Sequence, residues 1–237
     1  MTRKIEVDYG GTSIRFYISA PRGGNVRCLS VPSRPIDQLP RIIRQFLASR
    51  KIKRLNVLSV GAKSVWSKKE KNSLHQKLKG LAEKVLVCSD AEMAHARVFG
   101  ARAGLVLIAG TGSIALGRNS NGKIARAGGL GPKRGDEGSG FWIGKIYLGR
   151  TGKDFKNKSV RDLAALAPQV IRRAQAGDPI SKEIIHEAQS HLVRLASSVR
   201  RQLKEKSLRV RLTGGLFENA YFRKGFLDLL RSADAAL

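Results

Sequence analysis

The chain has 237 residues, of which 42% are apolar and 27% charged, and its formal net charge is +27. This apolar content supports a packed core, which excludes a disordered basic tail or a histone-like arm. The two cysteines are too few for a disulfide framework or a four-cysteine metal site, and they favour a reducing compartment. Without an apolar run of roughly 20 residues or a signal peptide, we expect a cytoplasmic protein with no membrane partner.

The first part of the chain predicts the order β-β-β-α-β-α-β-α. Alternating apolar residues indicate strands, and apolar residues at helical spacing indicate amphipathic helices. Two strands about a glycine turn are expected over 4–17, a third over 26–31, a helix over 36–49, a strand over 55–60, a basic helix over 68–84, a strand over 85–88 and a helix over 91–99.

The second part predicts β-β-β-α-α-α-β-α. We expect a strand, a tight turn and a strand over 103–117, a strand over 123–127, a glycine loop over 128–140, helices over 141–148, 160–176 and 180–203, a strand over 207–212 and a helix over 220–230. Two similar halves suggest a duplicated α/β architecture with lobes at 1–89 and 90–237. The final helix is a candidate to pack back on the first lobe.

The positive charge is heaviest in residues 1–87, which carry 19 basic and five acidic side chains. Such runs are most often solvated helix faces, and a nucleic-acid footprint is the alternative. No nucleic-acid module is recognised, and aromatic residues make up only 6% of the chain, which is thin for stacking on bases. Nucleic acid therefore stays open only as a minor partner.

Two glycine-flanked threonine turns carry the first chemical signal. Asp8 leaves a strand just before Gly10, Gly11 and Thr12, and the stretch Gly110-Thr111-Gly112 follows a second apolar strand. Glycines let backbone N–H groups approach phosphate oxygens, and an aspartate can reach hydrated Mg²⁺. The alternative is a pair of ordinary hairpin turns.

Three further segments place glycines or carboxylates where a predicted strand ends or a predicted helix begins. Asp90 follows a strand and could act as a general base, or as a helix N-cap. Asp136 and Glu137 lie in the glycine loop, where they could bind a ligand or cap the next helix. Gly214-Gly215 could let a flat base lie on the backbone, or could simply connect a strand to a helix. The four histidines have no assigned role.

Taken in order, these motifs resemble the BadF/BadG/BcrA/BcrD ATPase family, and within it the N-acetylglucosamine kinase branch. They read Asp-x-Gly-Gly-Thr, Ser-Asp-Ala, Gly-Thr-Gly-Ser, Gly-Asp-Glu-Gly-Ser-Gly-x-Trp-Ile-Gly and Thr-Gly-Gly. The resemblance covers nearly the whole chain and is most specific over 135–144. It implies the α/β, two-lobed actin-like ATPase fold (a duplicated ribonuclease H-like fold) with a nucleotide cleft and, here, a shortened C-terminal lobe.

The resemblance also implies a role for each motif residue, with ATP and Mg²⁺ as cofactors. Asp90 would be the catalytic base, and Asp8 would organise Mg²⁺ through water. The nucleotide would be held by Gly10, Gly11, Thr12, Gly110, Thr111, Gly112, Gly214 and Gly215. The sugar would be held by Ser113, Gly129, Leu130, Gly131 and Asp136.

The implied function is an ATP-dependent sugar kinase acting on N-acetylglucosamine or a related amino sugar, and the branch commonly forms homodimers. The sequence departs from the branch in two places. The sugar-contacting Asn after the third strand is absent from 30–35, and only about ten residues remain of a helical insert after Gly149. The alternative function is therefore a nucleotide-binding regulatory module without kinase activity, with affinity for a polyanion or a nucleic acid.

Overall fold

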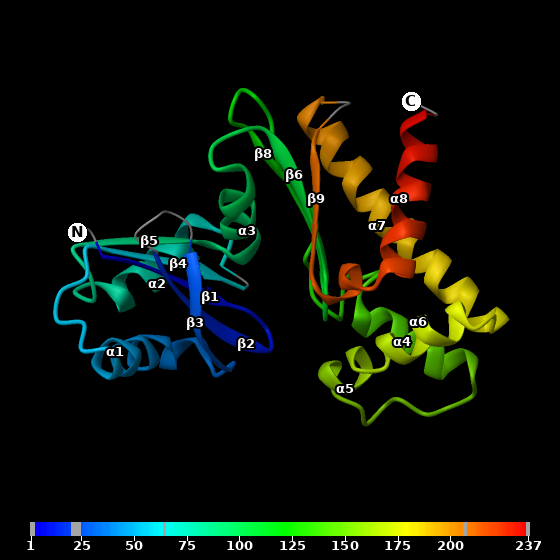
Figure 1. The fold of residues 1–237 in the computed structure, drawn as a ribbon, viewed down its shortest axis with the longest axis horizontal. Coiled ribbons are helices and arrows are strands. Elements are labelled where there is room, and N and C mark those ends of the chain that lie inside the picture. Colours follow the sequence, from blue (N-terminus) through cyan, green and yellow to red (C-terminus); the bar gives the residue numbers. More distant parts are fainter. Residues whose placement is uncertain (1–2, 20–24, 64, 206–207, 236–237) are drawn as a thin grey trace. The chain divides into compact units, whose positions relative to one another are not determined.

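The computed structural model describes residues 3–19, 25–63, 65–205 and 208–235 (Figure 1). The chain divides into two compact units, Met1–Ala94 and His95–Leu237, and each has its own sheet and its own core. In the described part of the chain, no helix combines the length and the apolar character that crossing a bilayer requires.

The first unit is built on a five-stranded sheet in the order β3-β2-β1-β4-β5. The strands are β1 (Lys4–Tyr9), β2 (Ser13–Ser19), β3 (Asn25–Pro32), β4 (Val57–Ala62) and β5 (Lys84–Ser89). β1, β4 and β5 run parallel, so their carboxyl ends meet at one edge of the sheet. That edge is where open α/β sheets place their ligands.

Helices α1 (Leu39–Ser49) and α2 (Lys68–Leu78) contribute buried side chains to the core of the first unit. Phe46 of α1 stacks on Phe16 of β2 with ring centroids 4.3 Å apart. The third helix, α3 (Asp90–Phe99), begins directly after β5 and crosses into the second unit.

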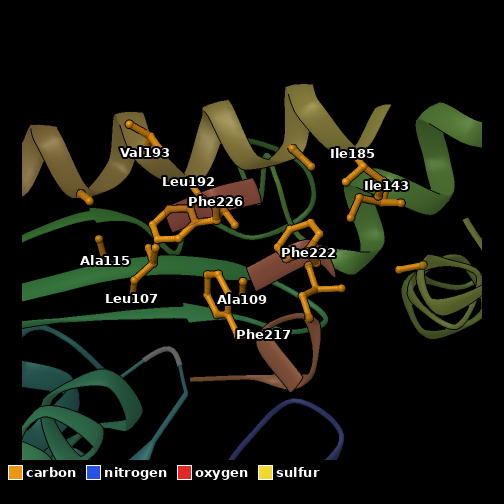
Figure 2. Packing of buried hydrophobic residues seen from close by; sticks show 14 of the residues in the cluster. Leu107, Ala109, Ala115, Ile143, Ile185, Leu192, Val193, Phe217, Phe222 and Phe226 are labelled. Carbon is orange, nitrogen blue, oxygen red and sulfur yellow. The ribbon is translucent and has the colours of Figure 1, made fainter. Parts of the chain in front are cut away.

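The second unit has a four-stranded sheet in the order β8-β7-β6-β9. Its strands are β6 (Gly104–Ala109), β7 (Ser113–Arg118), β8 (Ile124–Gly128) and β9 (Val210–Thr213). The 25-residue helix α7 (Pro179–Leu203) packs on β7 and β8, and α8 (Ala220–Ala235) packs on α7 (Figure 1). In Figure 2, Leu107 and Ala115 of the sheet lie on the same core as Phe222 and Phe226 of α8.

The region expected as one helix over 160–176 is two helices, α5 (Val160–Ala164) and α6 (Ala167–Gln175). Pro168 explains the break, because proline has no N–H to donate and clashes with the preceding turn, but fits the first turn of a new helix. Helix α4 (Gly140–Arg150) precedes them.

The helix expected over 68–84 ends at Leu78, and β5 begins at Lys84. Gly80, at φ +85°, ends the helix in a conformation that a side chain would disfavour. The strand expected over 55–60 is shifted to Val57–Ala62, which brings Lys63 to the sheet edge. The strand expected over 207–212 is found at Val210–Thr213, and residue 207 lies outside the described residues.

Candidate active site

The turn between β1 and β2 is tied to the segment that follows β3. The Ser33 N–H donates to the Thr12 carbonyl at 3.0 Å, and the Ser33 hydroxyl donates to the Gly10 carbonyl at 2.9 Å. Within the described residues, the N–H groups of Gly11 and Thr12 have no hydrogen-bond partner. Two neighbouring N–H donors on a fixed, exposed turn are suited to bind an anion.

A lysine that the sequence motifs did not single out lies over this turn. A Cβ built on Gly11 would lie 2.8 Å from the Lys63 Nζ atom. The Lys63 N–H donates to the Tyr9 carbonyl at 2.9 Å, which joins the segment after β4 to the end of β1. Its position in the sequence could have identified Lys63 as a site residue, because it follows a parallel strand at the same sheet edge as Asp8 and Asp90.

Asp90 is not the N-cap of α3, because Ser89 takes that role. The Glu92 N–H donates to the Ser89 hydroxyl at 3.1 Å, and the Ser89 N–H donates to the Glu92 carboxylate at 2.7 Å. This reciprocal pair is a capping box. The capping alternative for Asp90 is therefore removed. Its carboxylate accepts from the Ala91 N–H at 2.9 Å.

Burial raises the pKa of the Asp90 carboxyl above its usual range, and the nearby charge of Asp8 raises it further. The Ala91 N–H and the Lys63 cation oppose this shift without cancelling it. A carboxylate that holds a proton more tightly than usual is the kind that general-base chemistry uses.

The close approach of α3 to the sheet depends on Gly61. A Cβ at this position would lie 2.6 Å from the Met93 Cβ atom, so a larger residue in β4 would displace the helix. Met93 is buried one turn along α3 from Asp90. Gly61 therefore helps to fix where the Asp90 carboxylate lies.

Asp8 is the candidate metal-binding residue at the carboxyl end of β1. Its carboxylate accepts from Arg15 at 3.2 Å. Among the described residues, no three His, Cys, Asp or Glu side chains gather into a metal-binding group. A single carboxylate fits Mg²⁺ held largely by water and phosphate oxygens, which is how proteins commonly bind that ion with nucleotides.

In the second unit, the turn Gly110-Thr111-Gly112 between β6 and β7 rests on the start of α4. The Gly140 N–H donates to the Gly110 carbonyl at 2.7 Å, and the Phe141 N–H donates to the Thr111 carbonyl at 3.3 Å. The Gly110 N–H closes the turn on the Gly112 carbonyl at 3.0 Å. The helix start thus holds the turn in one shape.

Asp136 lies against this turn and is not the cap of α4. Ser139 caps that helix by accepting from the Trp142 N–H at 3.2 Å. Asp136 is 7% exposed and has φ +65°. Its carboxylate accepts from the Ser113 N–H at 3.2 Å, and a Cβ on Gly112 would lie 2.8 Å from the same oxygen. Burying a carboxylate costs free energy, and so does holding a non-glycine residue in the left-handed backbone conformation. Residues that carry such costs are typical of functional sites.

The structure brings the other predicted sugar contacts to Ser113 as well. The Gly129 N–H donates to the Ser113 carbonyl at 2.9 Å, and the Ser113 hydroxyl donates to the Glu137 carbonyl at 2.8 Å. Gly129 and Gly131 have φ of +69° and +79°, while the Leu130 side chain between them is 58% exposed. Ser113, Asp136 and residues 129–131 thus form one group, with an apolar side chain open to a ligand.

Gly214, directly after β9, packs against the end of β6. A Cβ there would lie 2.3 Å from the Ala109 carbonyl oxygen, and its φ is +99°, so only glycine fits. Gly215 begins a short 3-10 helix, Gly215–Glu218, and the space beside it is open. The backbone of residues 214–215 therefore lies next to the strand that leads into the second glycine turn.

Comparison with known proteins agrees with these features. The model of the BadF/BadG/BcrA/BcrD ATPase family matches residues 5–236. The chain is 35% identical over 188 residues to N-acetylmuramic acid/N-acetylglucosamine kinase of Clostridium acetobutylicum, covering 63% of this chain and 61% of the relative. It is 35% identical over 163 residues to N-acetyl-D-glucosamine kinase of Dictyostelium discoideum, covering 54% of this chain and 50% of the relative. The match thus spans less than two thirds of either relative.

Among solved structures, the fold is similar to that of a Chromobacterium violaceum protein provisionally described as an N-acetylglucosamine kinase. The TM-score is 0.75 at 20% sequence identity, with 100% of this chain and 94% of that chain covered. The likeness shows the fold, which is the actin-like ATPase fold of the sugar kinases. The fold class implied by the motifs is thereby confirmed.

Proposed function

Because the chain belongs to the BadF/BadG/BcrA/BcrD ATPase family, we propose that it is an ATP-dependent kinase that phosphorylates a hydroxyl of an amino sugar, N-acetylglucosamine or a close relative of it. The observation that carries this proposal is Asp90. Its carboxylate lies at the sheet edge beside the first glycine turn, is relieved of capping by Ser89, and has a raised pKa. The names of the two curated relatives support the choice of an amino sugar.

The residues at the two glycine turns fit a nucleotide. The N–H groups of Gly11 and Thr12, which have no partner among the described residues, would bind phosphate oxygens. The family resemblance gives the turn at residues 110–112 the same role. Gly214 and Gly215 would lie by the adenosine. Asp8 would hold Mg²⁺ through water. When bound, MgATP supplies the phosphoryl group and neutralises its developing charge.

Asp90 would orient the acceptor hydroxyl and take its proton as the phosphoryl group transfers. Because burial makes this carboxylate a stronger base than an exposed aspartate, it accepts a proton more readily at neutral pH. Ser113, Gly129, Leu130, Gly131 and Asp136 would hold the sugar. Phosphoryl transfer depends mainly on positioning and electrostatics, so loops that hold the two substrates and one general base could catalyse it.

The first prediction tests Asp90 directly. Asp90→Asn keeps the shape of the side chain and removes the base, so we expect kcat with an amino sugar and ATP to fall by about 10²–10⁴-fold while ATP affinity is kept. The measurement is ADP release with a panel of sugars, combined with nucleotide binding by calorimetry. Asp228→Asn, the same change at an ion-paired position on α8, is the matched control. Transfer at the wild-type rate in Asp90→Asn would exclude Asp90 as the base.

The second candidate is a nucleotide-binding regulatory module, which the net charge of +27 favours. The same panel separates the two functions. ADP release that depends on one sugar supports the kinase. ATP hydrolysis that no sugar stimulates, together with tight and salt-sensitive binding of RNA or DNA, supports the module.

A further inference from the structure

The Lys63 ammonium lies against the turn that is proposed to bind nucleotide phosphates. The three atoms nearest to a Cβ built on Gly11 all belong to the Lys63 side chain, and Nζ is the closest at 2.8 Å. The N–H groups of Gly11 and Thr12, which have no partner among the described residues, belong to the same turn. An anion bound by these N–H groups would therefore lie within reach of the ammonium as well.

Two backbone hydrogen bonds fix the position from which the Lys63 side chain extends. The Lys63 N–H donates to the Tyr9 carbonyl at 2.9 Å, and the Val65 N–H donates to the Ala62 carbonyl at 3.3 Å. The first bond ties residue 63 to the end of β1, and the second closes a turn directly after β4. The side chain itself is exposed, so it can adjust to a ligand at the turn without moving the backbone.

Lys63 has no counter-ion of its own. Within the part of the chain that the structure describes, its ammonium forms no hydrogen bond and no ion pair. Two nearby carboxylates have other partners: Asp8 accepts from Arg15 at 3.2 Å, and Glu70 accepts from two backbone N–H groups at the start of α2, at 2.9 Å and 2.7 Å. An unbalanced cation beside two N–H donors favours an anionic ligand.

The charge of Lys63 also acts on the proposed base. It lowers the pKa of Asp90, against the burial that raises it, so the ammonium is near both the turn and this carboxylate. In phosphoryl transfer the attacking and leaving oxygens lie on opposite sides of the transferred group. The phosphate closest to the base is therefore the terminal one, and that is the phosphate that Lys63 can reach.

We propose that Lys63 is a further catalytic residue, whose ammonium binds the terminal phosphate of ATP at the Gly11–Thr12 turn and stabilises its charge during transfer. The inference rests on the proposed kinase function and adds a residue that lies outside all the sequence motifs. Hydrogen bonds from a charged donor are shorter and stronger than those from neutral N–H groups. A fixed donor aimed at developing charge has its largest effect on kcat.

The role of Lys63 in the transfer is electrostatic. The bond between the terminal phosphorus and the oxygen that bridges it to ADP breaks, and a bond between that phosphorus and the sugar oxygen forms. Asp90 takes the proton of the sugar hydroxyl, and the electron pair of the broken bond stays with ADP. Lys63 keeps its own proton throughout and donates hydrogen bonds to the phosphate oxygens.

Lys63→Met tests this role, because it keeps the aliphatic part of the side chain and removes the ammonium. We expect kcat with an amino sugar and ATP to fall by about 10²-fold, while KM for the sugar stays within about threefold. Calorimetry should show about tenfold weaker binding of a non-hydrolysable ATP analogue and ADP binding within about twofold, since ADP lacks the terminal phosphate. The urea midpoint should be unchanged because the side chain is exposed.

Lys69→Met is the matched control. Lys69 belongs to α2, has no hydrogen bond or ion pair within the described residues, and shares with Lys63 the lining of a pocket of about 570 Å³ beside the turn. The control therefore removes the same charge from the same pocket. A contact with the terminal phosphate predicts a loss in Lys63→Met alone, with Lys69→Met within about threefold of the wild type.

The outcomes separate this role from the proposed function. Weaker binding of the ATP analogue but not of ADP in Lys63→Met, with no transfer to any sugar by the wild type, supports the phosphate contact and overturns the kinase. Sugar-dependent transfer whose kcat Lys63→Met leaves within threefold overturns the role of Lys63 and keeps the kinase. Equal losses in Lys63→Met and Lys69→Met also overturn that role, because they would reflect the overall charge of the pocket.

Discussion

Two requirements on Asp90 oppose each other. A general base must be ionised to accept a proton, whereas burial disfavours the ionised carboxylate. Burial, and then the charge of Asp8, raise the pKa of Asp90 in the folded protein. The folded state thus binds this proton more tightly than the unfolded chain. Its contribution to stability is complete below the ordinary aspartate pKa of about 3.9 and is lost as the pH rises through the raised value. At neutral pH the ionised Asp90 therefore costs stability.

Asp90→Asn should for this reason be more stable than the wild type at neutral pH. We expect a gain in the free energy of unfolding on the order of 1 kcal/mol at pH 7.5, which shrinks towards zero near pH 4. Urea unfolding at the two pH values measures it.

Asp228→Asn is the control, because the pKa of Asp228 is shifted in the opposite direction to that of Asp90. The hydrogen bond from Lys224 lowers the pKa of Asp228, so its ionised form is favoured in the folded protein. This variant should therefore gain nothing at neutral pH. An Asp90→Asn variant that is less stable than the wild type at pH 7.5 would show that the carboxylate is not strained by its surroundings.

The sequence alone left Asp90 and Asp136 open between capping and function. The hydrogen bonds of Ser89 and Ser139 settle the capping question, because Ser89 caps α3 and Ser139 caps α4. For Ser89 the signal was present, since Ser-x-x-Glu is the pattern of a capping box. Lys63 was missed because the strand before it was placed two residues too early. Its position over Gly11 is a tertiary contact that no local pattern encodes.

At the scale of elements, glycines and apolar spacing predicted nearly every strand and helix in the right order. The errors fall where a single residue interrupts a helical pattern, as Pro168 does between α5 and α6 and Gly80 does after α2. Both residues were visible, but apolar spacing continued across them. The sequence did not show how closely neighbouring helices and strands pack against each other. The closest such packing around a glycine is that of α4 on α5.

Gly144→Ala should be strongly destabilising. A Cβ at Gly144 of α4 would lie 1.9 Å from the Leu163 carbonyl oxygen of α5, so the two helices would have to separate. We expect a loss of about 2–3 kcal/mol in the free energy of unfolding, measured by urea denaturation.

Gly149→Ala is the matched control on the same helix. Its Cβ would meet nothing closer than the Phe155 ring at 3.8 Å, and alanine is a better helix former than glycine. This variant should be neutral or gain up to about 1 kcal/mol. Equal effects of the two substitutions would mean that α4 and α5 are not in tight contact in solution.

At the scale of the whole molecule, the net charge of +27 is not required by the proposed reaction. The proposed nucleotide contacts come mostly from backbone N–H groups. Residues 88–150, which hold most of the motifs, carry nine basic and four acidic side chains, whereas residues 1–87 carry 19 and five. The excess is therefore densest in the segment that also carries the first glycine turn, and we expect it to govern how the protein associates with polyanions.

We expect non-specific binding to nucleic acids that is separate from catalysis. Fluorescence anisotropy with two duplexes of unrelated sequence should give equal dissociation constants, with the logarithm of the affinity falling linearly with the logarithm of the salt concentration. A saturating duplex should leave kcat with the sugar acceptor within about twofold of its value without nucleic acid, because the proposed nucleotide contacts come mostly from backbone N–H groups and not from the cations that bind a duplex. Binding that discriminates between the duplexes, or that persists at high salt, requires base or shape recognition beyond phosphate contacts. That outcome, combined with ATP hydrolysis that no sugar stimulates, would make the regulatory module the better account of this chain.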